Sequence, residues 1–342
     1  MDSLPQVSVL FPVRDTAATL DQAMQSLLGQ TFPAFEIVAV DDGSTDGSGE
    51  RLESWARRDP RVRLLRRPPR GLVAALEEGR AACRGPFIAR MDADDLCHPE
   101  RLAAQLAYLQ EHPRVDVVGS LVEGRTVDGA PLARGMARYL DWSNALVDPA
   151  EIARERFIES PLVHPSVMLR RSVLDGGGYR DGPFPEDYEL WLRLLGRGLV
   201  LAKVPRVLLT WREHPARATR RDPRYSAKNH RALKVEALLE GPLRGGPRVL
   251  FWGAGFEGKP ILRQLRARGC DVVAVVDIDP RKIGNRVHDT KVVPREAVKG
   301  LLERHRDLVV LIAVGVPEAR RDIRGDLAAF DLVEGERYFF LR

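Results

Sequence analysis

The sequence predicts an α/β protein with a mainly parallel sheet covered by helices on both faces, followed by a second, smaller α/β domain. Short apolar runs of strand length alternate with stretches of helical periodicity over residues 7–118, which is typical of parallel sheets. A Gly/Pro-rich stretch at 241–247 precedes a new strand-turn-helix pattern that starts at Arg248. The 342 residues, 44% of them hydrophobic, suffice for two domains with sizeable cores.

The first domain is expected to contain five buried strands separated by helices. Apolar runs predict these strands at residues 7–11, 36–40, 62–65, 87–91 and 115–118. Thr16 can cap a helix that ends at Leu28, with Leu20, Met24 and Leu27 on one face. Further helices are expected at 52–58, at 71–84 and from Pro99 onward.

The remaining sequence is less regular until the second domain begins. We interpret residues 124–160 as an insertion or loop region, followed by a strand at 166–169 and a helix at 187–195. In the second domain we expect strands at 248–252, 271–276 and 308–314, and a helix at 261–268. The predicted division is therefore a first domain at 1–214, a basic helical linker at 215–247 and a second domain at 248–342.

Composition favours a cytoplasmic protein. The three cysteines, Cys83, Cys97 and Cys270, have neither disulfide-framework nor metal-ligand spacing. Residues 1–6 lack the basic and apolar regions of a signal peptide, and no apolar run reaches membrane-spanning length. We expect no nucleic-acid partner.

The excess of basic residues is concentrated in one segment. The net charge is +5, and residues 215–235 contain Asp222 and seven basic residues: Arg217, Arg220, Arg221, Arg224, Lys228, Arg231 and Lys234. This segment can be a solvated helix face, or it can face phosphates or an anionic membrane surface. In the second case the protein would lie peripherally at the inner face of the membrane.

Three carboxylate clusters follow predicted strands or precede a helix, where an α/β sheet places ligands. They are residues 41–46, residues 92–95 and the pair Glu186 and Asp187. In the second cluster Asp92, Asp94 and Asp95 repel one another unless a cation neutralises them. Carboxylate oxygens suit Mg²⁺ or Mn²⁺, which usually share their ligand shell with phosphates. The alternative is a surface turn that caps the helix at Pro99.

Four motifs in order give the first domain a resemblance to a known family. Pro-Val-Arg-Asp at 12–15, Asp-Asp-Gly-Ser-Thr-Asp at 41–46 and Asp-Ala-Asp-Asp at 92–95 each follow a predicted strand. Glu-Asp-Tyr-Glu-Leu-Trp-Leu-Arg comes at 186–193. Over residues 7–210 the chain resembles the family-two glycosyltransferases of GT-A fold. The resemblance implies a glycosyltransferase that uses a nucleotide-diphosphate sugar and forms a polysaccharide or glycoconjugate.

The same resemblance assigns the donor and metal side of the site. Pro12 and Arg14 match the loop that lines the base and ribose, and Asp42 matches the aspartate that hydrogen-bonds the base. Asp92 matches the residue near the ribose, and Asp94 matches the metal ligand of the Asp-x-Asp pair. His214 matches a histidine that in some members lies near the metal and the diphosphate.

On the acceptor side the resemblance implies an inverting, in-line displacement. Asp187 matches the catalytic base that takes the proton of the acceptor hydroxyl, with Glu186 beside it. His164 matches a histidine near the acceptor, which would be a glycan or a lipid-linked sugar. Each of these residues also has a structural alternative: Asp187 can cap its helix, and His164 and His214 can be ordinary loop histidines.

One motif departs from the family. Many members carry Ala-Arg-Asn after a glycine equivalent to Gly71, and the arginine holds the donor. Here Leu76 and Glu77 replace the arginine and the asparagine. We expect Arg70, or alternatively Arg67 or Arg90, to supply the missing charge, which leaves the donor identity open.

The second domain carries a glycine turn of its own. Gly253, Gly255 and Gly258 form a G-x-G-x-x-G between a predicted strand and helix, and Asp277 ends the next strand. The segment resembles a Rossmann-type nucleotide-binding half, so an NAD-like nucleotide is one interpretation. The favoured one is a structural, regulatory or partner-docking role, since glycines at such turns also serve strand-helix packing.

Two further functions compete with the transferase. One is an NAD-dependent sugar-nucleotide oxidoreductase or epimerase, in which the second domain does the chemistry. The other is a non-catalytic sensor of sugar nucleotides. Loss of metal-dependent turnover in an Asp94 variant separates the transferase from the NAD enzyme, and binding without turnover across many acceptors would favour the sensor.

Overall fold

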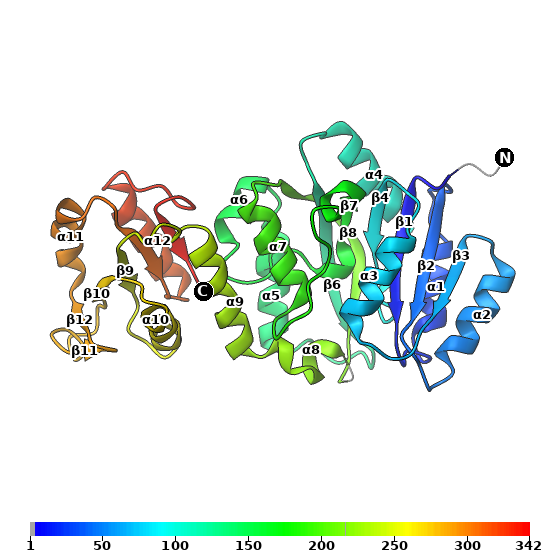
Figure 1. Cartoon of the computed structure of the whole chain (residues 1–342), viewed down its shortest axis with the longest axis horizontal. Coiled ribbons are helices and arrows are strands. Elements are labelled where there is room, and N and C mark those ends of the chain that lie inside the picture. The colour runs from blue at the N-terminus through cyan, green and yellow to red at the C-terminus, as the bar shows by residue number, and fades with distance from the viewer. Residues whose placement is uncertain (1–3, 216) are drawn as a thin grey trace. The chain divides into compact units, whose positions relative to one another are not determined.

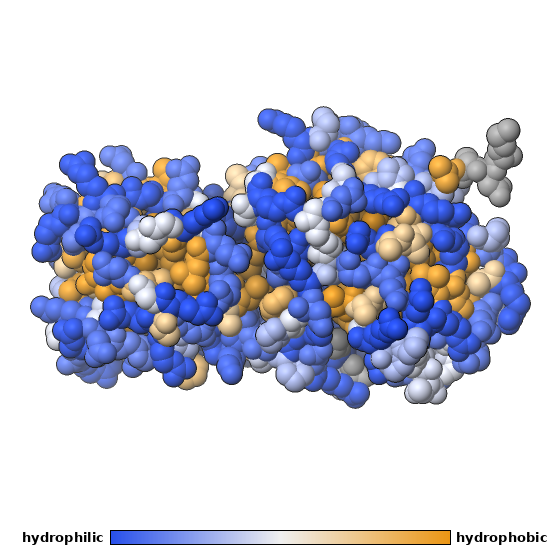
Figure 2. Space-filling view, in the orientation of Figure 1, coloured by the Kyte–Doolittle hydropathy of each residue, from blue (hydrophilic) through white to orange (hydrophobic). Residues whose placement is uncertain are grey.

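A computed structural model describes residues 4–215 and 217–342, which divide into two compact units (Figure 1). The N-terminal unit contains the chain up to Ile152, Pro161–Gly182 and Arg197–Asp222. The C-terminal unit contains Ala153–Ser160, Pro183–Gly196 and Pro223–Arg342. Hydrophilic side chains cover most of the face drawn in Figure 2, with apolar patches between them.

The N-terminal unit is built on an eight-stranded sheet with the strand order β3-β2-β1-β4-β7-β6-β8-β5. Neighbouring strands are parallel from β3 to β4 and between β6 and β8, whereas β7 and β5 run antiparallel to their neighbours. The strands are β1 (Val7–Val13), β2 (Phe35–Asp41), β3 (Val62–Arg66), β4 (Phe87–Arg90), β5 (Leu96–Cys97), β6 (Val117–Thr126), β7 (Met168–Arg170) and β8 (Leu201–Glu213).

Helices cover both faces of this sheet. Successive side chains of a strand point to opposite faces, so a strand that is apolar throughout needs helices on both sides. Phe11 of β1 packs in one core with Leu20 and Met24 of the first helix. Leu10 points the other way, against Gly79 of the third helix. The helices of this unit are α1 (Leu20–Leu28), α2 (Ser48–Arg58), α3 (Leu72–Ala82), α4 (Arg101–Glu111), α5 (Arg134–Ala145) and α8 (Ala218–Arg221).

The C-terminal unit contains a second, smaller sheet of six strands in the order β11-β12-β10-β9-β13-β14. All neighbouring strands are parallel except β11 and β12. The strands are β9 (Val249–Trp252), β10 (Val272–Val276), β11 (Arg286–Val287), β12 (Thr290–Val293), β13 (Val309–Ile312) and β14 (Tyr338–Phe340).

The helices of the C-terminal unit include one that comes from the middle of the chain. Tyr188 and Leu192 of α7 (Glu186–Gly196) share a core with Leu238 of α9 (Ala227–Glu240) and Phe251 of β9. The other helices are α10 (Gly258–Ala267), α11 (Val298–Arg304) and α12 (Pro317–Ala328). The domain boundaries at 214 and 247 remain predictions. Each compact unit combines several segments that are separated in the sequence, so the units do not correspond to single continuous ranges.

The predicted α/β fold class is confirmed, but the sequence prediction missed the secondary structure of two segments. The expected loop region at 124–160 contains the end of β6, α5 and α6 (Pro149–Glu155). The helix α5 buries only Leu140 and Ser143, so its sequence lacks the apolar stripe that marks most helices. The strand β8 was missed because Lys203, Arg212 and Glu213 interrupt its apolar run, although all three are buried.

No helix in residues 4–215 and 217–342 combines the length and the apolar character that a membrane span requires.

Candidate functional site

Three loops meet at one edge of the N-terminal sheet. The strands β1, β2 and β4 are parallel neighbours, so their carboxyl ends lie at the same edge. Arg14 follows β1, Asp42 follows β2, and the acidic loop Asp92 to Asp95 follows β4. The topology therefore brings together residues that lie up to eighty positions apart in the sequence.

The acidic loop gathers three carboxylates. Asp92, Asp94 and Asp95 each offer an oxygen that lies within 4.8 Å of the other two. Asp95 is fully buried, whereas Asp92 and Asp94 are half-buried. Such a cluster is unfavourable unless positive charge compensates it.

Two arginines supply part of that charge. The Arg217 guanidinium lies 3.1 Å from Asp95 Oδ1 and 3.5 Å from Asp92 Oδ2, and Arg90 pairs with Asp92. Arg217 is itself buried and stacks 4.5 Å over the ring of Trp211, which fixes its orientation. The cluster is thus held by one cation that is adjacent in the sequence, Arg90, and one that is distant, Arg217.

The end of β8 completes the surroundings of the loop. His214 Nε2 lies 2.8 Å from Asp94 Oδ2, and the backbone N–H of Arg212 donates to Asp95 Oδ1 at 2.8 Å. The Arg212 side chain donates to the backbone carbonyl of Asp94. The predicted metal residues Asp94 and His214 are therefore direct neighbours, although 120 positions separate them.

The surroundings shift the pKa values of Asp94 and Asp95 in opposite directions. Burial opposes the charged form of Asp94, but Arg217, His214 and Arg90 outweigh it and lower its pKa. Burial raises the pKa of Asp95 well above its usual range; Arg217 opposes this shift, and the charges of Asp94 and Asp92 add to it. A cation placed among the three carboxyls would favour the charged form of all of them.

The residues present fit a divalent cation. Asp95 Oδ2 is buried and has no hydrogen-bond partner within the described part of the chain. Asp92 and Asp94 add oxygen ligands, and His214 adds a ring nitrogen beside Asp94. This set of mainly carboxylate oxygens is the kind that Mg²⁺ and Mn²⁺ prefer.

Asp42 organises the second loop of the edge. Its carboxylate accepts hydrogen bonds from the backbone N–H groups of Arg70 and Gly71 at 2.7 and 2.9 Å. It also lies 3.2 Å from the Arg14 guanidinium. The Arg70 side chain is 64% exposed and lies 3.7 Å from Glu78, so Arg70 contacts Asp42 through its backbone. Pro12 is buried in β1 beside this loop.

The predicted acceptor residues divide between the two units. In the N-terminal unit His164 is buried, with its Nε2 2.9 Å from the hydroxyl of Tyr179. In the C-terminal unit Glu186 and Asp187 begin α7. Glu186 is buried and accepts a hydrogen bond from the Tyr225 hydroxyl at 2.7 Å, whereas Asp187 is half-buried.

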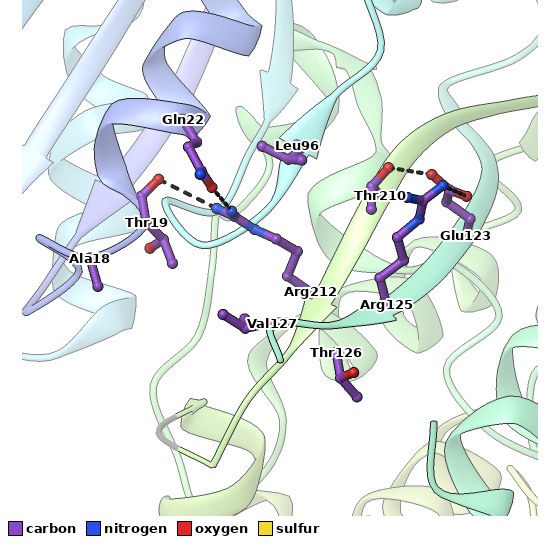
Figure 3. A pocket seen from close by; sticks show the side chains of 10 residues that line it. All are labelled: Ala18, Thr19, Gln22, Leu96, Glu123, Arg125, Thr126, Val127, Thr210 and Arg212. Carbon is purple, nitrogen blue, oxygen red and sulfur yellow. Dashed lines mark hydrogen bonds and ion pairs between the residues drawn. The ribbon is translucent and has the colours of Figure 1, made fainter. Parts of the chain in front are cut away.

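A hollow of about 320 Å³ is lined by residues of α1, β5, β6 and β8 and of the loops next to them (Figure 3). Arg212 forms one wall, with its guanidinium directed at Gln22 and the Thr19 carbonyl. On the other side Thr210 donates to Glu123 at 2.7 Å. The lining residues are Ala18, Thr19, Gln22, Leu96, Glu123, Arg125, Thr126, Val127, Thr210 and Arg212. None of them was a predicted site residue.

The sequence did not indicate that two basic residues, Arg217 and Lys234, are buried. Arg217 and Lys234 were counted in the basic segment as candidates for a solvated or membrane-facing surface, but both are buried. That part of the interpretation was wrong. The available signal was position: Arg217 follows His214 by three residues, so one short turn can bring both to the acidic loop.

The N-terminal part of the chain is similar in sequence to known proteins. The sequence profile of Glycosyl transferase family 2 matches residues 8–177. The chain is 33% identical over 198 residues to the amylovoran biosynthesis glycosyltransferase AmsE of Erwinia amylovora, covering 57% of this chain and 71% of that protein. It is 27% identical over 224 residues to the UDP-Gal:alpha-D-GlcNAc-diphosphoundecaprenol beta-1,3-galactosyltransferase of Escherichia coli, covering 64% and 78%.

A solved structure supports the fold. The crystal structure of S. aureus TarS 1–349 in complex with UDP-GlcNAc matches 70% of this chain and 68% of that chain, with a TM-score of 0.53 and 18% identity. The N-terminal sheet with its acidic edge is thus a GT-A fold, and the protein is a glycosyltransferase. The chain belongs to glycosyl transferase family 2.

Proposed function

We propose that the protein is a metal-dependent, inverting glycosyltransferase that moves a sugar from a nucleotide-diphosphate donor to an acceptor hydroxyl. The observation that carries the proposal is the cluster of Asp92, Asp94 and Asp95 beside His214 at the carboxyl edge of the sheet. The product would be a polysaccharide or glycoconjugate. The relative AmsE is named a glycosyltransferase of amylovoran biosynthesis, which supports a biosynthetic role of this kind.

Asp94, His214 and Asp92 would hold the divalent ion, Mg²⁺ or Mn²⁺. When bound, such an ion stabilises the negative charge of a leaving diphosphate. Arg217 and Arg90 keep the carboxylates in place without filling every oxygen, since Asp95 Oδ2 has no hydrogen-bond partner among the described residues. The loop is therefore built to accept one more cation.

The donor would lie along the edge formed by the β1 and β2 loops. Asp42 holds the Arg14 side chain and the backbone at Arg70 and Gly71, so it shapes the surface for the base and ribose. The buried Pro12 would stiffen the end of β1, which carries Arg14 into this surface. The exposed Arg70 side chain can move from Glu78 to the donor, because a surface ion pair contributes about 0–1 kcal/mol.

Asp187 would act as the general base of the transfer. The acceptor oxygen attacks the anomeric carbon while its proton passes to the Asp187 carboxylate. The bond from that carbon to the diphosphate oxygen breaks, and the configuration at the carbon inverts. Glu186 and His164 would act on the acceptor side.

The acceptor class is proposed from the relatives. The name of the Escherichia coli relative contains a diphosphoundecaprenol-linked sugar, which is lipid-linked. A lipid-linked acceptor would draw this enzyme to the inner face of the membrane from the cytoplasm, where three free cysteines are stable. Exposed basic residues such as Arg221 and Lys228 would contribute, whereas the buried Arg217 and Lys234 would not.

The substitution Asp187→Asn tests the catalytic base. Transfer should be abolished while binding of the nucleotide sugar and Mn²⁺ survives, because the amide cannot accept the proton but keeps the shape of the side chain. Product formation and calorimetric donor binding measure the two effects. Asp271→Asn, which alters an exposed carboxylate in the same unit, is the matched control. Normal turnover by Asp187→Asn would remove this residue from the mechanism.

Flotation with liposomes tests the membrane proposal. Binding should increase with the fraction of anionic lipid and decrease in the double variant Arg221→Gln, Lys228→Gln. Flotation that does not depend on anionic lipid would contradict it.

A further inference from the structure

The carboxyl edge of the C-terminal sheet has features that the transferase reaction does not use. The strands β10, β9 and β13 are parallel neighbours, so the loops after them lie side by side at this edge. The loop after β9 is the glycine turn, the loop after β10 begins with Asp277, and the loop after β13 leads to Val316. In open parallel sheets ligands bind at this edge.

The fold itself requires two of the three glycines in the turn. Gly253 has φ +113°, and a Cβ there would lie 2.9 Å from the carbonyl oxygen of Ala313. A Cβ on Gly258 would overlap with the carbonyl oxygen of Gly253, so α10 can begin this close to β9 only with glycine. These two residues are explained by strand-helix packing.

The fold does not explain Gly255. Its φ is not in the left-handed region, and a Cβ there would meet nothing within 4 Å. A side chain at this position would project into open space above the turn. In a dinucleotide fingerprint the middle glycine lets the pyrophosphate approach the backbone, and this role fits a position that is free of internal contacts.

Asp277 joins the glycine turn to the end of β10. The residue is 8% exposed, and its Oδ2 accepts a hydrogen bond from the backbone N–H of Ala254 at 2.9 Å. Lys282 Nζ lies 3.0 Å from the same oxygen, and the N–H of Asp279 donates to Oδ1 at 2.9 Å. The carboxylate is therefore fixed beside the turn, in the position from which an acid binds ribose hydroxyls.

Apolar side chains on the same three loops face solvent. Phe256 is 88% exposed, Ile278 is 73% exposed and Val316 is 56% exposed. One follows each of the adjacent strands β9, β10 and β13. Three exposed apolar groups at one sheet edge are unfavourable in water and suit a flat, apolar partner such as a nucleobase.

The charge at the turn does not exclude an anion. Glu257 is the acidic residue within the turn, and it pairs with Arg342 and, at 4.0 Å, with Arg231. Arg342 also lies next to Gly315, in the loop after β13. A phosphate that approaches Gly255 would therefore meet backbone N–H groups and a neutralised carboxylate.

We propose that this edge binds a nucleoside diphosphate, with the diphosphate over Gly255 at the start of α10, the ribose at Asp277 and the base against Ile278 and Val316. The proposal does not depend on the transferase activity, since it uses a different sheet and no metal ligand. A dinucleotide and a sugar nucleotide share this chemistry, so the ligand can come from either source.

The test is isothermal titration calorimetry on the full chain carrying Asp94→Asn, in EDTA, which removes metal-dependent donor binding. The probes are NAD and UDP-glucose, and we expect saturable binding of at least one of them. The one that binds identifies the source of the ligand. Failure of the proposed transferase would leave this result unchanged, because no turnover is measured.

Gly255→Asp should then weaken binding at least about tenfold, because its carboxylate would occupy the phosphate position. The fold should tolerate it, since the Cβ has open space. Gly325→Asp places the same charge in open space on α12 and should bind like the parent. The absence of binding by both probes at about 1 mM, or equal binding by Gly255→Asp, would overturn the proposal.

Discussion

The two sheets of this chain place opposite chemistry at the same kind of edge. In the N-terminal unit the loops after parallel strands carry carboxylates, and Asp92, Asp94 and Asp95 lie within 4.8 Å of one another. In the C-terminal unit the corresponding loops carry glycines, the acids Glu257, Asp277 and Asp279, and the exposed apolar residues Phe256, Ile278 and Val316. The first edge suits a cation that neutralises a diphosphate, and the second suits a diphosphate held by backbone N–H groups.

The parallel-sheet architecture that both units share therefore determines only where a ligand binds. Parallel strands expose the ends of several loops together, whatever those loops contain. The side chains then decide which ligand suits each edge: clustered carboxylates suit a divalent cation, and a glycine turn suits a phosphate. Substitutions at both edges and at a buried lysine test the contrast between the two units.

The largest effect is expected from Asp94→Asn at the acidic edge. Loss of one carboxylate ligand beside His214 should reduce metal-dependent transfer by at least about 100-fold. Transfer of sugar from nucleotide donors, measured across a Mn²⁺ titration, gives the result. Asp128→Asn, in an exposed turn of the same unit, should leave the rate unchanged. If Asp94→Asn turned over normally, the acidic edge would not be a metal site.

An intermediate effect is expected within the glycine turn of the other edge. Gly258→Ala should lower the free energy of unfolding by about 1–3 kcal/mol, because the new methyl group overlaps with a backbone carbonyl. Gly255→Ala should change it by less than about 1 kcal/mol, because the methyl group meets no neighbour. Denaturant unfolding of the two variants measures the contrast. Equal destabilisation would mean that Gly255 also serves packing.

The smallest effect at neutral pH is expected from Lys203. Like Lys234 in the other unit, this lysine is buried against backbone carbonyl groups. Lys203 in the N-terminal unit donates to the carbonyl and the hydroxyl of Ser143, and burial lowers its pKa to about 7. Lys234 in the C-terminal unit donates to the carbonyls of Ile158 and Leu341. Burial also lowers the pKa of Lys234, but the charge of Glu159 opposes the shift.

The sign of the Lys203 effect follows from proton linkage. Between pH 7 and about 10 the unfolded chain binds this proton and the folded chain does not, so stability rises with pH. Relative to Lys203→Met, the parent should gain up to about 1.4 kcal/mol of unfolding free energy per pH unit over this range. Urea unfolding from pH 7 to 9 checks it. A difference that does not change with pH would mean that Lys203 stays charged in the folded chain.

Several parts of the fold and site could be predicted from the sequence because their signals are local. The strands β1 and β2 are mostly apolar, with only Ser8 and Glu36 among their inner residues being polar, and the acidic loop comes shortly after β4. The strand β8 and the helix α5 could not be predicted, because their burial depends on partners distant in the sequence. Lys203 is buried only because Ser143 supplies a carbonyl and a hydroxyl sixty positions away. Asp42 was predicted to bind the nucleotide-sugar donor. No sequence pattern indicated that its carboxylate accepts hydrogen bonds from the backbone N–H groups of Arg70 and Gly71.

The α/β class, the order of the four motifs and the resemblance to family-two glycosyltransferases could be read from the sequence alone. These properties depend on periodicity and on residues within a few positions of one another. Only the tertiary structure decided that Arg217 neutralises Asp92 and Asp95, and that His214 lies 2.8 Å from Asp94. Charged groups are buried only where an opposite charge or hydrogen-bonding groups surround them, and these partners come from distant parts of the chain. Strand order, rather than sequence spacing, determines which parts meet.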